Sequence, residues 1–113
     1  MLVGYARVST QDQNPDLQLD ALRKGGCEQI FVEKISGAGK KNRPEWEECS
    51  RMLRQGDILA VWRLDRLGRS LKDLVEIMQG LEDRGIGFRS LTESIDTGSA
   101  GGKLIFHIFG ALA

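Results

Sequence analysis

Four short apolar segments, separated by segments with helical periodicity, constrain the fold of this chain more than any other feature. They span residues 2–8, 29–35, 58–62 and 86–91. Short apolar runs rich in Val, Ile and aromatic residues favour buried strands. Strands that alternate with helices predict a mainly parallel sheet with right-handed crossovers. We therefore expect a three-layer α/β fold, in which helices flank a sheet of four or five strands. At 113 residues, the chain is long enough for one domain with a single core.

The segments between these strands carry helix start and stop signals. A capping residue or proline opens each helix and glycine ends it: Asn14 and Gly25-Gly26, Pro44 and Gly56, Ser70 and Gly85. Ser70 also forms, with Asp73, the pattern of a capping box. The apolar residues predicted to share a helix face are Leu17, Ala21 and Leu22, then Trp46, Cys49 and Leu53, and finally Leu71, Leu74, Met78 and Leu81. We expect residues 92–102 to form a loop and residues 103–113 to begin an apolar helix.

The distribution of charge says more about a partner than the total charge does. The formal net charge is zero, which by itself gives no reason to propose a nucleic-acid partner. Basic residues are nevertheless clustered in two groups: Arg63, Arg66, Arg69 and Lys72, and Lys40, Lys41 and Arg43. Local positive clusters on a neutral chain suit one phosphate site better than a long surface that follows DNA.

Several kinds of protein are excluded by what the sequence lacks. No apolar run reaches the roughly 18 residues of a membrane span, and the first residues lack the pattern of a signal peptide. We therefore expect a cytoplasmic protein. Cys27 and Cys49 have no CxxC partner, and the single histidine, His107, is far from both in sequence. They predict neither a disulfide framework nor a metal site, and we expect no cofactor.

Two groups of candidate reactive residues follow predicted strands. Ser9 follows the first strand, and residues 63–69 follow the third. Because ligands collect beyond the carboxyl ends of parallel strands, we expect both groups at one edge of the sheet. Guanidinium groups stabilise the charge of a phosphodiester transition state, so Arg7, Arg66 and Arg69 can surround a phosphate while the serine hydroxyl attacks it. A serine nucleophile needs activation: either the cations favour its alkoxide, or a neighbouring group takes its proton.

Three motifs, in the same order as in a known family, cover essentially the whole chain. They are GYARVSTQDQ at 4–13 followed by DLQLDAL at 16–22, WRLDRLGRS at 62–70, and SLTESIDTGSAGG at 90–102. With these motifs the sequence resembles the serine site-specific recombinases, a family of resolvases and DNA invertases. The third motif and GCEQIF at 26–31 resemble the invertases more closely. The resemblance implies a resolvase-like catalytic domain over residues 1–113, with helices around a flavodoxin-like sheet.

The resemblance implies a role for each matching residue. Ser9 matches the nucleophile, which joins the 5′ phosphate of cut DNA and releases a 3′ hydroxyl. Either Asp65 or Arg69 helps to protonate the leaving group. The covalent bond keeps the energy of the phosphodiester, so rejoining requires neither ATP nor a metal. The remaining matches are the arginines around the scissile phosphate (Arg7, Arg66 and Arg69), a further cation from a mobile loop (Arg43), two polar residues that organise the site (Asp65 and Gln18) and a supporting aromatic (Tyr5).

The resemblance also implies partners: double-stranded DNA, a homodimer and homotetramer of the full-length protein, and an accessory DNA-bending protein in the bacterial nucleoid. Two departures from the family are visible. Glu33 occupies a position that is usually aspartate. Similar proteins continue past the position of Ala113 with more of an interface helix and a helix-turn-helix domain. We therefore expect this chain, with a truncated interface helix, to bind DNA weakly and without specificity, and to recombine little on its own.

Two other functions stay open. One is a small phosphohydrolase on a flavodoxin-like sheet, although the sequence shows no cysteine nucleophile loop, no carboxylate cluster for a metal and no glycine-rich phosphate cradle. The other is a non-catalytic interaction module that has kept the fold of a recombinase. The complete set of matching arginines together with Ser9 argues against such a module, because a decayed site would tolerate their loss.

Overall fold

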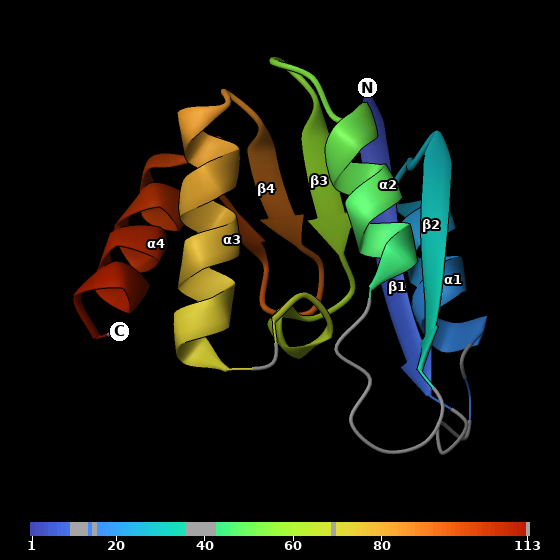
Figure 1. Ribbon diagram of the computed structural model, residues 1–113. Helices are drawn as coiled ribbons and strands as arrows, with labels where there is room; N and C mark the ends of the chain where they lie inside the picture. The colour runs from blue at the N-terminus through green and yellow to red at the C-terminus, as the bar shows by residue number, and fades with distance from the viewer. Residues whose placement is uncertain (10–13, 15, 36–42, 69, 113) are drawn as a thin grey trace.

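A five-stranded sheet forms the centre of the molecule (Figure 1). The computed structural model describes residues 1–9, 14, 16–35, 43–68 and 70–112. Its strands are β1 (Leu2–Ser9), β2 (Gln29–Ile35), β3 (Ile58–Val61), β4 (Gly87–Ser90) and β5 (Ile95–Asp96). They lie in the order β2-β1-β3-β4-β5; β1 to β4 are parallel, and β5 runs antiparallel to β4. The expected α/β fold with a mainly parallel, flavodoxin-like sheet is confirmed.

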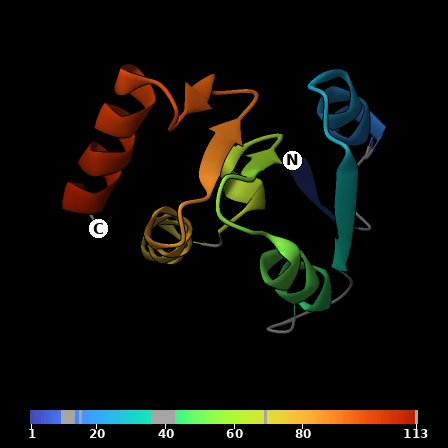
Figure 2. The ribbon, with the colours of Figure 1, turned by 90° about the horizontal axis from the view of Figure 1, so that it is seen from above.

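Helices cover both faces of the sheet. They are α1 (Asp16–Lys24), α2 (Pro44–Met52), α3 (Leu71–Asp83) and α4 (Ala100–Leu112), with a short 3-10 helix, η1, at Leu64–Arg66. Figure 2 shows α2 and α3 on one face and α1 on the other, with α4 beside α3 at the β5 end. Strands β1 to β4 end toward the bottom of Figure 1, at what we call the carboxyl edge. None of the helices in the described ranges is long and apolar enough to cross a membrane.

The alternation of side chains along β1 divides the core between the two faces. Tyr5 is fully buried in the cluster under α2 and α3, whereas Ala6 is fully buried in the cluster under α1. The larger cluster includes Val3, Leu59, Val61, Cys49, Leu53, Leu74, Met78, Leu81, Phe88 and Phe106. The smaller one joins Ala6, Leu22 and Ala60. Burial on both faces explains why the strand segments are continuous apolar runs in the sequence.

The prediction of a loop over residues 92–102 is wrong, because this segment contains β5 and the first turn of α4. A strand of two residues has no periodicity by which it can be recognised, and Gly101 and Gly102 are poor helix formers. The Oγ of Ser99 nevertheless caps this turn, accepting a hydrogen bond from the backbone N of Gly102 at 3.0 Å. A Cβ at position 102 would lie 1.8 Å from the Asp96 carbonyl oxygen. Close packing of α4 on β5 therefore requires the glycine.

Two residues of the predicted apolar faces are exposed, and the predicted end of one helix is wrong. Leu17 and Leu71 are 52% and 40% exposed, because each lies in the first turn of its helix, at the carboxyl edge rather than in the middle of the packed face. Gln18 is buried in place of Leu17. Helix α2 ends at Met52, before Gly56, whose φ of 93° serves the turn into β3.

Candidate active site

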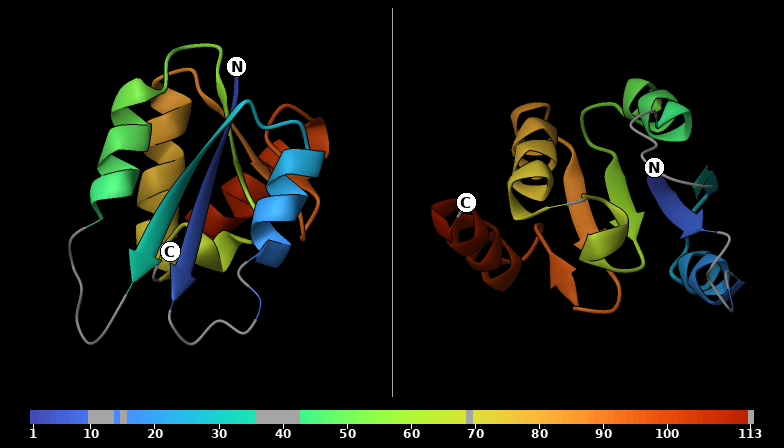
Figure 3. Two further views of the ribbon diagram at one scale, coloured as in Figure 1. Left: turned by 90° about the vertical axis from the view of Figure 1, so that its right-hand side faces the viewer. Right: turned by 60° about the horizontal axis from the view of Figure 1, so that its bottom comes forward.

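The candidate reactive residues meet where β1 and β3 end. Tyr5 lies opposite Val61, the last residue of β3, so β1 continues beyond β3 to Ser9. In a sheet of this order, β1 and β3 flank the topological switch point, at which ligands bind. The Arg7 guanidinium donates a hydrogen bond to the carbonyl oxygen of Asp65 in η1. The end of β1 and the residues after β3 therefore share one edge, as predicted, and Figure 3 brings this edge forward in its right-hand view.

Three site residues on β1 lie on the same face of the sheet. Because successive side chains alternate, Tyr5, Arg7 and Ser9 point to the face that α2 and α3 cover. Arg7 and Ser9 are half-buried. From α1, the Nε2 of Gln18 donates to the Arg7 carbonyl oxygen at 3.2 Å. Gln18 is itself only 2% exposed, so a buried amide fixes the backbone of β1 just before Ser9.

Arg43 lies directly before α2 and ties separate segments together. Its Nη2 donates to the Tyr5 hydroxyl at 3.0 Å and to the Leu67 carbonyl oxygen at 2.6 Å. Its Nη1 lies 3.9 Å from the Asp73 carboxylate, and its guanidinium carbon is 5.4 Å from the centre of the Tyr5 ring. The Arg43 side chain is 11% exposed, so these contacts hold it largely inside the molecule. Residues 36–42, where the sequence between β2 and Arg43 combines glycines and lysines, lie outside the described residues.

Glu33 joins this network from β2. The residue is 3% exposed, and its Oε1 accepts hydrogen bonds from the backbone N of Trp46 at 3.0 Å and from the Tyr5 hydroxyl at 3.4 Å. Arg43, the N-cap residue of α2, makes no side-chain capping bond. The carboxylate therefore supplies, from a neighbouring strand, the acceptor and the negative charge that favour a helix N-terminus. The glutamate that departs from the usual aspartate thus joins β2 to α2.

Burial keeps the Tyr5 hydroxyl protonated. Desolvation raises the pKa of Tyr5 to about 12, although the hydrogen bond and the charge of Arg43 lower it in part. The neutral hydroxyl can donate to Glu33 while it accepts from Arg43. Both groups are thereby satisfied in a buried position, which requires tyrosine rather than phenylalanine there.

The arginines that follow β3 are partly exposed. The Oδ1 of Asp65 lies 3.3 Å from the Nε of Arg63 and 3.9 Å from the Nε of Arg66. The two guanidinium carbons lie 4.5 and 6.0 Å from the centre of the Trp62 ring. Ion pairs of such an exposed carboxylate contribute little to the stability of the fold. A phosphate can therefore take the place of the Asp65 carboxylate as the partner of Arg63 and Arg66 with little loss of stability. Arg69, the third predicted arginine, lies outside the described residues.

A hollow of about 460 Å³ opens at the carboxyl edge, over η1 and the start of α3. Asp65 lines it, and so does Glu93, to which the sequence motifs assign no role. The only signal for this glutamate is its place within the third motif. The full lining is Arg63, Leu64, Asp65, Gly68, Ser70, Leu71, Leu74 and Glu93. The hollow therefore connects the segment after β3 with the turn after β4.

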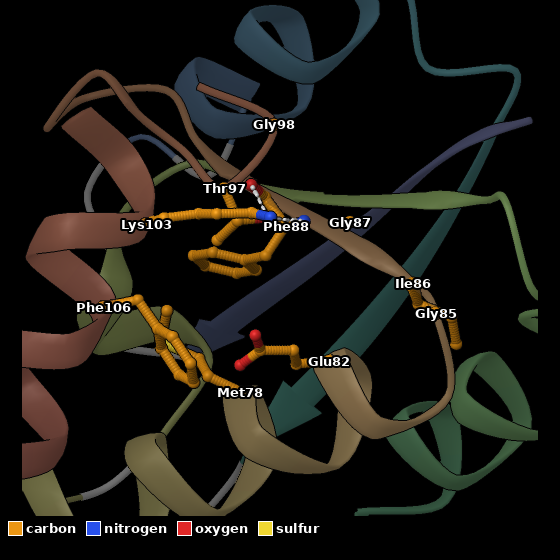
Figure 4. Close-up of a pocket in the computed structure, with 10 residues that line it drawn as sticks. All are labelled: Met78, Glu82, Gly85, Ile86, Gly87, Phe88, Thr97, Gly98, Lys103 and Phe106. Carbon is orange, nitrogen blue, oxygen red and sulfur yellow. Dashed lines mark hydrogen bonds between the residues drawn. The ribbon is translucent and has the colours of Figure 1, made fainter. Parts of the chain in front are cut away.

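A cavity of about 310 Å³ between α3, β4 and α4 is separate from this site. Figure 4 shows Met78, Phe88 and Phe106 around it, with Glu82 and Lys103 reaching toward it from α3 and α4. None of the predicted site residues lines it. Within the part of the chain that the structure describes, no three His, Cys, Asp or Glu side chains gather as ligands for a metal ion.

Comparison with protein families and curated proteins gives one consistent result. The family model described as Resolvase, N terminal domain, matches residues 2–113. The chain is 56% identical over its whole length to the serine recombinase gin of Escherichia phage Mu, and 51% identical over 98% of its length to the DNA-invertase hin of Salmonella typhimurium. It spans 58% of the length of each. It is 43% identical to the Tn917 resolvase of Enterococcus faecalis, over the whole chain and 61% of that protein. The predicted closer resemblance to the invertases is confirmed.

Solved structures agree with the fold. The N-terminal catalytic domain of TP901-1 integrase matches with a TM-score of 0.81 at 30% identity, covering 98% of this chain and 92% of that one. A resolvase family site-specific recombinase from Streptococcus pneumoniae matches with a TM-score of 0.74 at 19% identity, covering 98% and 83%. At that identity, the second likeness concerns the fold alone.

Proposed function

This chain belongs to the resolvase family, and from that membership we propose that residues 1–113 are the catalytic domain of a serine recombinase. The proposed reaction is the cutting and rejoining of double-stranded DNA in site-specific recombination. Because the chain spans 58% of the length of its relatives from phage Mu and Salmonella, this activity is proposed for the whole protein to which the domain contributes.

In the proposed reaction, the Oγ of Ser9 attacks the phosphorus of a DNA phosphodiester. A bond forms between Oγ and phosphorus as the serine proton passes to a neighbouring group or to solvent. The bond from phosphorus to the 3′ oxygen breaks, and that oxygen leaves as a 3′ hydroxyl with a proton from Asp65 or Arg69. Attack by the 3′ hydroxyl of a recombined strand on the 5′-phosphoserine reverses the step. One phosphoester replaces another, so rejoining needs no ATP.

The observation that carries the proposal is the hydrogen bond from Arg7 to the Asp65 carbonyl oxygen. It joins the strand that ends in Ser9 to the arginine-bearing segment at the switch point of the sheet. Guanidiniums at this edge can bind two phosphate oxygens at once and stabilise the charge that develops in the transition state. Arg66 belongs to this set by its place in η1, and Arg69 by its place in the sequence.

We propose that Arg43 adds positive charge to the site from its inner side. Its Nη2 is occupied by the Tyr5 hydroxyl and the Leu67 carbonyl oxygen, whereas its Nε has no hydrogen-bond partner among the described residues. An arginine has five N–H donors, so Arg43 can keep both bonds and still donate to a phosphate. Tyr5 then supports the arginine, and Gln18 supports the strand that carries Ser9.

The proposed partners are double-stranded DNA, further copies of the full protein as homodimer and homotetramer, and an accessory DNA-bending protein in the bacterial nucleoid. Subunit packing is supported by α4, on which Leu104 and Ile108 are 61% and 48% exposed. Exposed apolar side chains on one helix are typical of a surface that another subunit covers.

The test is whether a covalent protein–DNA adduct depends on the Ser9 hydroxyl. The chain is joined to a sequence-specific DNA-binding domain and incubated with duplexes that carry paired sites for that domain. We expect an adduct in the unchanged protein and its loss in Ser9→Ala. The matched control Ser50→Ala removes a surface hydroxyl on α2 and is expected to retain the adduct. An equal yield of adduct in Ser9→Ala would exclude Ser9 as the attacking group.

A further inference from the structure

The turn after β4 packs against the segment after β3. The backbone N of Leu91 donates to the Val61 carbonyl oxygen at 3.0 Å, and that of Thr92 to the Trp62 carbonyl oxygen at 2.9 Å. These bonds continue the pairing of β3 with β4 past the ends of the strands. The turn therefore extends as far as η1 and brings Glu93 beside it.

Glu93 holds the start of η1 through its carboxylate. The backbone N of Leu64 donates toward both carboxylate oxygens, at 3.3 and 3.4 Å, and the Ser90 hydroxyl donates to one of them. Arg63, the N-cap residue of η1, makes no side-chain capping bond. The first N–H groups of a helix have no partner within the helix, so an acceptor has to come from elsewhere. Glu93 is that acceptor, 29 residues away in the chain.

Glu93 is exposed, but its carboxylate accepts a hydrogen bond from a side chain of the core. Ser90, which donates to it, is fully buried. Ser94, the next residue, has a φ of 56°, a left-handed conformation that costs a serine on the order of 1 kcal/mol. The fold therefore tolerates backbone strain in the turn that presents Glu93. Strain of this kind persists only where surrounding contacts hold the backbone in place.

Three contacts then fix η1 along its length. The Glu93 carboxylate holds its start. Arg7 donates to the carbonyl oxygen of Asp65 in its middle, and Arg43 donates to that of Leu67 at its end. Two of these contacts come from residues already included in the proposed site. The third comes from a residue to which neither the motifs nor the proposed reaction gives a part.

We propose that Glu93 is a positioning residue, which directs Arg66 toward the scissile phosphate by holding the start of η1. The inference rests on the proposed function, because it concerns the same site. The carboxylate acts through the backbone of η1 and takes no part in the bond changes at phosphorus. Misplacement of a catalytic group by about 1 Å can lower a rate by about 100-fold. Loss of this anchor should therefore slow cleavage without weakening DNA binding.

The test compares the rate of adduct formation at saturating DNA with the Kd for DNA, in the fusion protein used for the Ser9 experiment. Glu93→Ala and the similarly sized Glu93→Met both remove the acceptor. We expect each to slow adduct formation about 10- to 100-fold, while the Kd changes by less than about twofold. Glu93→Asp keeps a capping carboxylate and should remain within about threefold of the unchanged rate. The matched control, Glu28→Ala, removes an exposed glutamate before β2 and should leave both quantities unchanged.

An unchanged rate in folded Glu93→Ala or Glu93→Met would overturn the inference. So would a loss of rate that Glu93→Asp does not restore, or one that a weaker Kd fully explains. Thermal unfolding gives the folded fraction to which each rate is referred, and Glu93→Met decides the matter where Glu93→Ala does not fold. Failure of the proposed function has a different signature, because the adduct would then persist in Ser9→Ala.

Discussion

Among single residues, Tyr5 connects the core most directly with the proposed site. Its ring packs in the larger apolar cluster, where the centres of the Tyr5 and Trp46 rings are 5.3 Å apart. Its hydroxyl joins Glu33 to Arg43. Removal of either polar partner would leave a buried donor or acceptor unsatisfied, which is costlier than the net gain from one hydrogen bond. Tyr5 thus supports the proposed site, because its hydroxyl holds the Arg43 guanidinium, which apolar side chains alone could not hold.

The burial of Tyr5 predicts a raised pKa that can be measured directly. Its folded-state pKa of about 12 exceeds the ordinary value of 10.0. The neutral hydroxyl therefore contributes stability that is fully present below about pH 10 and is lost as the pH rises through about 12. Tyr5 is the single tyrosine, so tyrosinate absorbance reports it alone. We expect a midpoint near 12 in the folded chain and near 10 in denaturant, with circular dichroism recorded in parallel. A midpoint near 10 in the folded chain would contradict this description of its surroundings.

The sequence predicts which segments meet at the carboxyl edge better than it predicts the contacts between their side chains. Strand order and chain direction are enough to bring Ser9 and Arg66 to one edge, because parallel strands end together. The contacts of Glu33 with Trp46 and of Arg43 with Tyr5 join residues 13 and 38 positions apart. Such contacts depend on how whole helices pack on the sheet, and no local pattern reports them.

Among the helices and strands, η1 and α3 are joined by a segment in which Gly68 lies very close to the first turn of α3. A Cβ at Gly68 would lie 2.7 Å from the backbone N and Cα of Leu74, so only glycine lets the connection lie against the first turn of α3. The cap of that turn is the one predicted, since the Oγ of Ser70 accepts a hydrogen bond from the backbone N of Asp73 at 3.1 Å. Cap and glycine together set where η1 ends and α3 begins.

Substitution of Gly68 tests this packing. Gly68→Ala forces the backbone of η1 away from Leu74, and we expect it to lower the free energy of unfolding by about 1–3 kcal/mol. The matched control is Gly80→Ala within α3, where a Cβ meets nothing within 4 Å. That change should raise the free energy of unfolding by about 0.5–1 kcal/mol, through helix propensity. Urea unfolding measures both, and equal effects of the two substitutions would show that Gly68 is not required for close approach.

The sequence predicts those helices and strands whose signals lie within their own residues. The four parallel strands arise from apolar runs, and α3 from an apolar stripe with its own cap. Strand β5 and the first turn of α4 depend on how this segment folds back on itself, through the pairing of β5 with β4 and the approach of Gly102 to Asp96. Glycine next to glycine favours a loop when only neighbours in sequence are considered, and packing on β5 outweighs that preference.

For the whole molecule, strand order determines where chemistry can occur. The order β2-β1-β3-β4-β5 places the switch point between β1 and β3. Ser9 at the end of β1, the 3-10 helix η1, Glu33 and Glu93 all belong to segments at or near that point. A net charge of zero is compatible with a DNA substrate, because Arg7, Arg43 and Arg66 lie together at the carboxyl edge even though the total charge is balanced. The carboxyl edge, as a unit, is what the proposed function requires.

The proposed function depends above all on a bond between the Ser9 oxygen and a DNA phosphorus. The adduct formed by the fusion protein is digested with a protease and a nuclease, and the modified peptide is sequenced by mass spectrometry. We predict a nucleotide attached through its 5′ phosphate to Ser9. Attachment to any other residue, or through a 3′ phosphate, would show that the proposed reaction is wrong.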